Sequence, residues 1–135
     1  MEIELLHKET TEQIIKAFYK VYNTLGFGFL EKVYENALSA ELITKGFQVE
    51  NQKRLEVYYE NRLVGEYFAD IIVAEKIIVE LKSAESLHPA HEAQLMNYLK
   101  ATEIEIGLLL NFGVKPEFKR KVFTNARKTF RTKIE

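Results

Sequence analysis

The spacing of the apolar residues changes at Gly46, and this change constrains the fold more than any other feature of the chain. Before Gly46, apolar residues recur every three or four positions, which predicts two amphipathic helices, over about residues 11–25 and 30–45. Beyond it, Leu55, Val57 and Tyr59 alternate with polar residues, as is typical of a strand. The chain is therefore expected to begin with a helical hairpin and to continue as a sheet.

The remaining elements follow from the same kind of pattern. A strand over residues 62–73 is expected after the turn-like Glu60-Asn61, and two almost wholly apolar stretches, 76–81 and 104–110, are typical of strands buried on both faces. Pro89 suits the first turn of a helix that ends near residue 101. The predicted order is ααβββαβ, an α/β (α+β) fold. The alternation beyond Pro116 adds a short C-terminal edge strand, followed by a basic helix or a loose tail.

Length and composition limit the class of protein. A chain of 135 residues predicts a single domain, 1–135, and 47% hydrophobic with 29% charged residues is the balance of a folded globular chain. The absence of cysteine excludes disulfides, thiolate zinc sites and a cysteine nucleophile, and it fits a reducing compartment. No apolar run approaches the roughly 18 residues that span a bilayer. We therefore expect a cytoplasmic protein with no membrane association.

The charge is distributed unevenly along the chain. Residues 115–133 hold eight Lys or Arg and one acid, Glu117, so this stretch has a net charge of +7 against −8 for the remainder of the chain. It forms most of a basic C-terminal tail at about 115–135. Such asymmetry suggests a local surface for a polyanion such as nucleic acid, and a solvated tail is the equally good structural explanation.

Two acidic residues are expected to meet in the sheet. If the strands 62–73 and 76–81 form a hairpin with its turn near Glu75, Asp70 lies opposite Glu80, with about 5 Å between their Cβ atoms. Two carboxylates at this distance repel each other unless a cation lies between them. Carboxylate oxygens are ligands of Mg²⁺ or Mn²⁺, and the absence of cysteine disfavours zinc.

Lys82 lies two residues beyond Glu80, so both side chains point to the same face of the strand. Beside a metal, its ammonium can orient an attacking water and stabilise charge on a phosphoryl oxygen. The competing interpretation is structural, and spacing alone favours it. Glu80 and Lys82 would then be the solvated end of a strand.

The helix over residues 89–101 offers further polar candidates. His91, Gln94 and Tyr98 share one helical face, which either lines a cleft or is solvated, while the residues expected to pack on the sheet are Ala93, Met96 and Leu99. His88 and His91 have the spacing of metal ligands, but a histidine just before Pro89 is more typical of a helix cap.

Residues 28–34 read GFLEKVY, with Gly28, Glu31 and Tyr34 three residues apart. On structural grounds alone, Glu31 suits the positive end of a helix dipole and Tyr34 suits the core. The stretch also resembles the signature of the GxxExxY protein family, which is placed in the PD-(D/E)XK nuclease superfamily. The resemblance covers about residues 11–113.

Two further motifs follow in the order expected for that superfamily. Asp70, followed after nine residues by Glu80 and Lys82, resembles its split catalytic motif, although Ala69 stands where the motif name has proline. The stretch QLMNY at 94–98 resembles the QxxxY motif of its exonuclease-like branch. The resemblance implies a restriction-endonuclease-like core, with a mixed central sheet flanked by helices, in agreement with the order predicted from periodicity.

The resemblance also implies an activity and roles for particular residues. It implies a Mg²⁺- or Mn²⁺-dependent nuclease that hydrolyses DNA or RNA. The metal ligands would be Glu31, Asp70 and Glu80. The catalytic group would be Asp70, Glu80 and Lys82, supported by Gln94 and Tyr98.

Two alternatives to a nuclease stay open. The first is a non-catalytic nucleic-acid-binding or protein-interaction module, in which the basic tail contacts phosphates through Lys119, Arg120, Lys121, Arg127, Lys128 and Arg131. The second is metal-dependent cleavage of a phosphorylated small molecule. A homodimer would suit a small nuclease that acts on two strands, although no residue indicates one.

Overall fold

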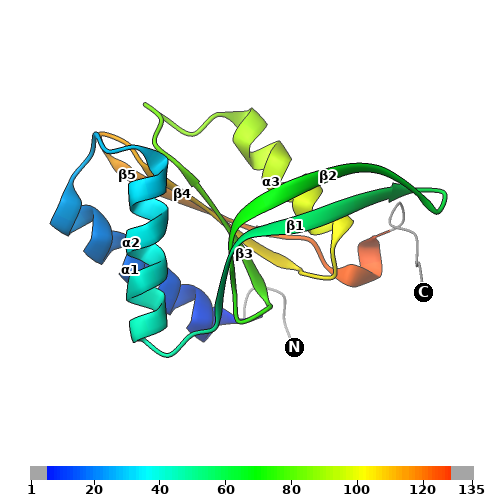
Figure 1. The fold of residues 1–135 in the computed structure, drawn as a ribbon, viewed down its shortest axis with the longest axis horizontal. Coiled ribbons are helices and arrows are strands. Elements are labelled where there is room, and N and C mark those ends of the chain that lie inside the picture. Colours follow the sequence, from blue (N-terminus) through cyan, green and yellow to red (C-terminus); the bar gives the residue numbers. More distant parts are fainter. Residues whose placement is uncertain (1–5, 129–135) are drawn as a thin grey trace.

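The computed structural model describes residues 6–128, which form one five-stranded mixed sheet flanked by helices (Figure 1). The elements in chain order are α1 (Lys8–Leu25), α2 (Glu31–Thr44), β1 (Val49–Tyr59), β2 (Arg62–Val73), β3 (Ile77–Lys82), α3 (Pro89–Ala101), β4 (Ile106–Phe112), β5 (Pro116–Val122) and the 3₁₀ helix η2 (Asn125–Arg127). The predicted fold class and element order are confirmed, including the edge strand β5. Helix α1 begins three residues earlier than the sequence predicts.

The strands follow chain order across the sheet, β1-β2-β3-β4-β5. All neighbouring pairs are antiparallel except β3 and β4, which are parallel because α3 carries the chain back between them. Strands β3 and β4 lie in the middle of the sheet. Every residue of β4 is buried, which confirms that this almost wholly apolar stretch belongs to a strand covered on both faces.

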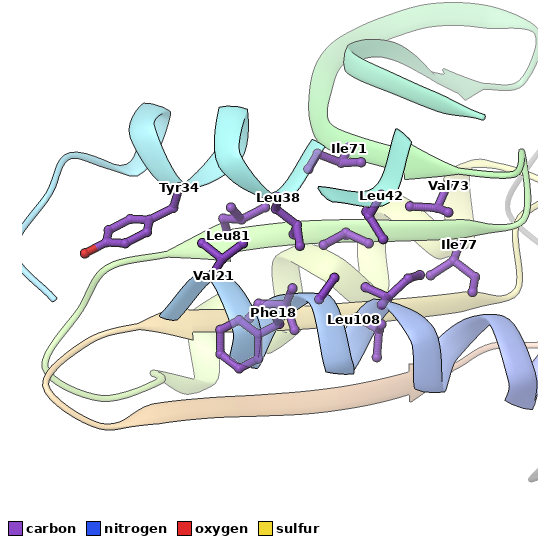
Figure 2. Close-up of a cluster of buried hydrophobic side chains, with 14 of the residues drawn as sticks. Phe18, Val21, Tyr34, Leu38, Leu42, Ile71, Val73, Ile77, Leu81 and Leu108 are labelled. Carbon is purple, nitrogen blue, oxygen red and sulfur yellow. The ribbon is translucent and has the colours of Figure 1, made fainter. Parts of the chain in front are cut away.

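Two hydrophobic clusters lie on opposite faces of the sheet. One joins α1 and α2 to the sheet through residues such as Phe18, Leu38 and Leu108 (Figure 2). The other packs α3 against the opposite face, where Leu109 points. Because Leu108 and Leu109 are neighbours in β4, their side chains point to opposite faces, and one strand contributes to both clusters.

Helix α2 ends in a Schellman motif, which fixes where the chain turns into the sheet. The N–H of Phe47 donates to the carbonyl of Leu42 over 3.1 Å, and the N–H of Gly46 donates to the carbonyl of Ile43 over 2.9 Å. Gly46 has φ 95°, a conformation that favours glycine. The change of hydrophobic period at Gly46 is therefore a structural boundary.

Helix α3 packs through a stripe that matches the prediction in part, since Met96 and Leu99 contact the cluster as expected. Leu95, Tyr98 and Leu99 are buried, and Met96 packs beside them, but Ala93 is exposed, so its predicted contact with the sheet is wrong. The reason lies in β4, where a Cβ atom on Gly107 would come within 2.7 Å of the Leu95 side chain. The missing side chain at Gly107 makes room for Leu95.

Strands β1 and β2 form a long twisted hairpin that extends beyond the rest of the sheet (Figure 1). Its turn lies at Glu60 and Asn61, both with positive φ, as the sequence predicts. The second hairpin, β2–β3, turns at residues 74–76 and pairs Val73 with Ile77. No helix within residues 6–128 is long and apolar enough to cross a membrane.

Candidate active site

The pairing of β2 with β3 stops at Ile71 and Val79, and the next residues along the two strands are Asp70 and Glu80. The register places these two acids across from each other, as the sequence predicts. In place of further ladder bonds, the N–H of Asp70 donates to Oε2 of Glu80 over 2.9 Å, and the N–H of Leu81 donates to Oδ2 of Asp70 over 2.9 Å. Each carboxylate is thus fixed by the backbone of the opposite strand.

Glu80 is the more deeply buried of the two acids, with 4% of its surface exposed. Burial raises the pKa of its carboxyl to about 8, and the charge of Asp70 raises it further, against the hydrogen bond from the Asp70 N–H and the charge of Lys82. A residue so buried is not the solvated end of a strand, so that interpretation of Glu80 is wrong.

Asp70 is partly buried beside Glu80. Burial raises the pKa of Asp70, and the charge of Glu35 acts in the same direction, while hydrogen bonds from Leu81 and Gln52 lower it. Two neighbouring carboxyl groups that both resist ionisation are typical of a functional site, where a cation or a proton is needed between them.

Two polar residues that the sequence analysis missed complete this acidic group. Gln52 in β1 donates its Nε2 hydrogens to Oε1 of Glu35 over 3.0 Å and to Oδ1 of Asp70 over 3.3 Å. Glu35 in α2 is 4% exposed, and it also accepts from Asn51 over 2.9 Å. Gln52 therefore connects an acid of the helix with an acid of the sheet.

The backbone at Gln52 is unusual for a strand residue. Pairing of β1 with β2 is recorded on both sides of it, at Asn51–Ile71 and Lys53–Ala69, but Gln52 itself has φ 52°. A non-glycine residue in the left-handed region is strained, and such strain concentrates at functional sites. No spacing in the sequence signals this kink, whereas Glu35 could have been found from its position one helical turn after Glu31.

Glu31 begins α2 and lies at the end of β3. Its Oε2 accepts a hydrogen bond from the N–H of Ser83 over 3.3 Å, and its charge contributes to the raised pKa of Glu80. The tertiary structure thus brings Glu31 to the same end of the sheet as the acidic pair. Its side chain is exposed, in contrast to that of Glu80.

Lys82 ends β3 and is partly exposed. Its charge lowers the pKa of both Asp70 and Glu80, although it forms no ion pair with any residue in the described part of the chain. An ammonium close enough to affect two acids, yet bonded to neither, is free to contact a substrate. Spacing along the strand had predicted this placement.

Gln94 and Tyr98 lie on α3 beside the same acids. Burial raises the pKa of Tyr98 to about 12, the charges of Glu80 and Asp70 raise it as well, and a side-chain hydrogen bond with Gln94 opposes them. The Tyr98 ring also lies against that of Tyr67 in β2, with 5.4 Å between the ring centroids. The face of α3 that carries Gln94 and Tyr98 therefore borders the acidic site.

His88 and His91 have a structural role at the start of α3. Nδ1 of His88 accepts from the N–H of Ala90 over 3.0 Å, and Nδ1 of His91 accepts from the N–H of His88 over 3.1 Å. This is a capping box, and it confirms the interpretation of His88 as a helix cap.

The donor set suits a hard divalent cation at Asp70 and Glu80. Oε1 of Glu80 accepts no hydrogen bond within residues 6–128, and the carboxylates of Asp70 and Glu80 supply oxygen ligands of the kind that Mg²⁺ prefers. In the described part of the chain, no three His, Cys, Asp or Glu side chains are grouped as a complete metal site. Mg²⁺ commonly uses only one or two carboxylates, with water and substrate phosphate as its other ligands.

The basic residues of the C-terminal segment make contacts within the protein. Lys119 and Lys121 form ion pairs with Glu92, at 3.8 and 2.6 Å. Arg120 donates to the carbonyl of Leu6, and Lys128 donates to backbone carbonyls of residues 102 and 104. Arg131 lies outside the described residues. Residues 116–128 are therefore not a loose tail, because strand pairing and side-chain contacts hold them against the sheet.

Comparisons with known proteins agree with this architecture. Residues 8–121 match the family described as the PD-(D/E)XK nuclease superfamily. Among solved structures, the crystal structure of SSO0001 superposes with a TM-score of 0.53 at 20% sequence identity, over 87% of this chain and 60% of that one. The likeness to SSO0001 concerns the fold alone, and the present chain spans less than two thirds of that protein. The comparison with curated proteins finds no match.

Proposed function

The chain belongs to the PD-(D/E)XK nuclease superfamily, and from this premise we propose that it is a Mg²⁺- or Mn²⁺-dependent nuclease that hydrolyses phosphodiester bonds of DNA or RNA. We further propose that its closer relatives are the GxxExxY proteins, because Gly28, Glu31 and Tyr34 keep that spacing. A single domain and a cytoplasmic location are part of the same proposal, and they rest on the length of the chain and the absence of cysteine.

The observation that carries this proposal is the convergence of Asp70, Glu80 and Lys82. Two acids face each other where the hairpin ladder opens, each is oriented by the backbone of the opposite strand, and the pKa of each is raised. An arrangement that serves only the fold would not place a buried acid beside a half-buried one, because burial and the neighbouring like charge both penalise ionised carboxylates.

The proposed roles follow from the positions of these side chains. Asp70 and Glu80 hold the divalent cation, and Glu31 contributes from the adjoining end of α2. A cation there supplies Lewis-acid stabilisation of the negative charge that develops on the phosphate during attack. Lys82 donates from its ammonium to the attacking water or to a phosphate oxygen, and Gln94 and Tyr98 position the groups around it.

Binding without turnover is the competing function. It would rely on the basic residues of the C-terminal segment, but Lys119 and Lys121 already face Glu92, and Lys128 is bonded to backbone carbonyls. These contacts reduce the charge available for phosphates, and the buried acidic pair has no role in that function. We therefore favour the nuclease.

The test is cleavage of labelled single- and double-stranded DNA and RNA with Mg²⁺, Mn²⁺ or EDTA. The wild type is compared with Asp70→Asn, which keeps the side-chain shape but removes the charge, and with Glu75→Gln, which removes an exposed charge at the turn of the same hairpin. We expect metal-dependent cleavage by the wild type and by Glu75→Gln, and none by Asp70→Asn. Equal cleavage by all three proteins would refute the proposed site.

A further inference from the structure

The loop between α1 and α2 presents three large apolar side chains to solvent. The exposed fractions are 60% for Phe27, 47% for Phe29 and 80% for Leu30. Isolated exposed apolar residues are common, but three within four positions of one short loop form a patch, and such a patch marks a site of interaction. The loop leads directly into Glu31, so the patch adjoins the proposed active site.

The loop is held in a defined conformation. The hydroxyl of Tyr34 donates to the carbonyl of Gly26 over 2.5 Å and accepts from the N–H of Phe29 over 3.2 Å. The Tyr34 ring is buried and comes from the first turn of α2 (Figure 2). It stacks on Phe112, with 4.3 Å between the ring centroids. Gly28 has φ 111°, which a larger residue adopts only with strain. The exposed phenylalanines are therefore displayed by an anchored loop.

This loop forms one wall of a cavity of about 690 Å³, and the opposite wall is equally fixed. That wall contains Ala84 and Gly113, whose backbones are in close contact. A Cβ atom on Gly113 would lie only 2.2 Å from the carbonyl oxygen of Ala84, so this position has no room for a side chain. The Asn111 side chain accepts from the N–H of Ala84 and donates to its carbonyl, over 2.9 and 3.0 Å. The cavity is therefore preformed.

The chemistry of the lining indicates what the cavity can hold. Phe27 and Phe29 offer aromatic rings, while Glu31 and Glu85 offer hydrogen-bond acceptors, and the residues that line the cavity include no lysine or arginine. Such a lining does not suit a phosphate or another anion. It suits a flat, uncharged ring that carries N–H donors, since the ring faces can stack on phenylalanine and the donors can reach the carboxylates.

We propose that this cavity binds an unpaired nucleobase of the substrate, which makes single-stranded nucleic acid, or a single-stranded segment of a larger molecule, the substrate class. The inference rests on the proposed nuclease function. Glu31 belongs both to the cavity lining and to the proposed ligand set, so a base seated on the phenylalanines places its own backbone beside the acidic site. A base within a duplex cannot enter, because its faces are covered by its neighbours.

The test measures binding separately from cleavage. Every protein carries Asp70→Asn, and its affinity for labelled single-stranded DNA, single-stranded RNA and duplex DNA is measured by fluorescence anisotropy at several salt concentrations. In this background Phe27 is changed to Ala, Leu or Tyr. The matched control is Tyr59→Ala, which removes an aromatic ring of 61% exposure at the far tip of the β1–β2 hairpin (Figure 1).

We expect Phe27→Ala and Phe27→Leu to weaken single-strand binding by roughly tenfold, because each removes one stacking surface. Phe27→Tyr and Tyr59→Ala should bind as the parent does. The salt dependence should be the same for all variants, since no phosphate contact is removed. Phe29→Ala tests the second phenylalanine of the loop in the same way. Thermal unfolding of every variant checks that the protein is folded.

Several results would overturn the inference. Unchanged affinity in Phe27→Ala would do so, and so would equal weakening of duplex binding. Full affinity in Phe27→Leu would show a simple apolar contact, of the kind a protein partner makes. If cleavage requires Asp70 but binding does not depend on Phe27, the proposed nuclease function stands and only the proposed base-binding site is refuted. Phe27-dependent binding without cleavage by the wild-type chain removes the nuclease and supports the cavity as a base-binding site, whereas the absence of both binding and wild-type cleavage overturns both proposals.

Discussion

The main-chain N–H of Asp70 donates a hydrogen bond of 2.9 Å to the carboxylate of Glu80. The backbone of β2, which carries Asp70, thus orients the carboxylate of Glu80. In turn, the carboxylate of Asp70 accepts a hydrogen bond from the N–H of Leu81 in β3. The acidic pair is built into the backbone of the hairpin, so changes at either position should affect both ionisation and ion binding.

Stability should depend on pH through Glu80. Its pKa is raised from 4.5 to about 8 in the folded protein, so between these values the folded state binds a proton that the unfolded state has released. The free energy of unfolding should therefore fall as pH rises through this window, by up to about 1.4 kcal/mol per pH unit from this group. Glu80→Gln should lack this contribution, as urea unfolding from pH 4 to 9 will show. Parallel pH profiles for the two proteins would contradict the expectation.

Divalent cations should stabilise the folded chain through the acidic pair. A ligand present at about 100 times its dissociation constant adds about 2.7 kcal/mol to the free energy of unfolding. We expect Mn²⁺ or Mg²⁺ to raise the unfolding temperature of the wild type, with the increase lost in Asp70→Asn and kept in Glu75→Gln. Calcium-free buffer with EDTA is the reference. The same increase in Asp70→Asn would place the ion elsewhere.

Lys82→Met should abolish most cleavage while leaving the fold intact. The side chain is partly exposed and forms no ion pair with a described residue, so its loss removes little from the folded state. A positioned proton donor or acceptor contributes roughly a hundredfold or more to a rate. The measurement is the single-turnover cleavage rate. Lys76→Met, an exposed lysine at the turn of the same hairpin, is the control and should cleave normally.

Gln52 should act as a positioning residue for Asp70. Outer partners of metal ligands typically contribute roughly 10- to 100-fold to metal affinity or activity, so Gln52→Ala and Gln52→Gly should lose about that much Mn²⁺ affinity. Because φ at this position is 52°, the glycine variant should be the more stable of the two, by about 1 kcal/mol. Calorimetric titration and urea unfolding separate these effects. Wild-type metal affinity in both variants would show that the Gln52 side chain serves only the fold.

Tyr34→Phe should loosen the loop that leads into Glu31. The change removes a hydroxyl that bonds Gly26 and Phe29 and keeps the ring that stacks on Phe112. We expect a loss of about 1 kcal/mol in the free energy of unfolding. Faster amide hydrogen exchange should be confined to residues 26–30. Tyr59→Phe, at the exposed hairpin tip, should change neither quantity.

The local sequence determined the helices and strands and the register of the β2–β3 hairpin. The change of hydrophobic period at Gly46 marked the end of α2, because helices and strands repeat their buried faces at different intervals. The meeting of Asp70 with Glu80 was also predictable, since a short hairpin connection fixes which residues lie opposite each other. The family motifs named the same two acids and Lys82.

Only the tertiary structure decided the environment of these residues. Packing from distant segments buries Glu80 and so raises its pKa. Gln52 contacts Glu35 and Asp70 from another strand, and Lys119 and Lys121 pair with Glu92 of α3. Each of these contacts joins segments that are far apart in the chain. Periodicity reports which face of an element is apolar, but it does not report which element covers that face. Such contacts depend on how helices pack on the sheet, and that packing is set by side chains from every element at once.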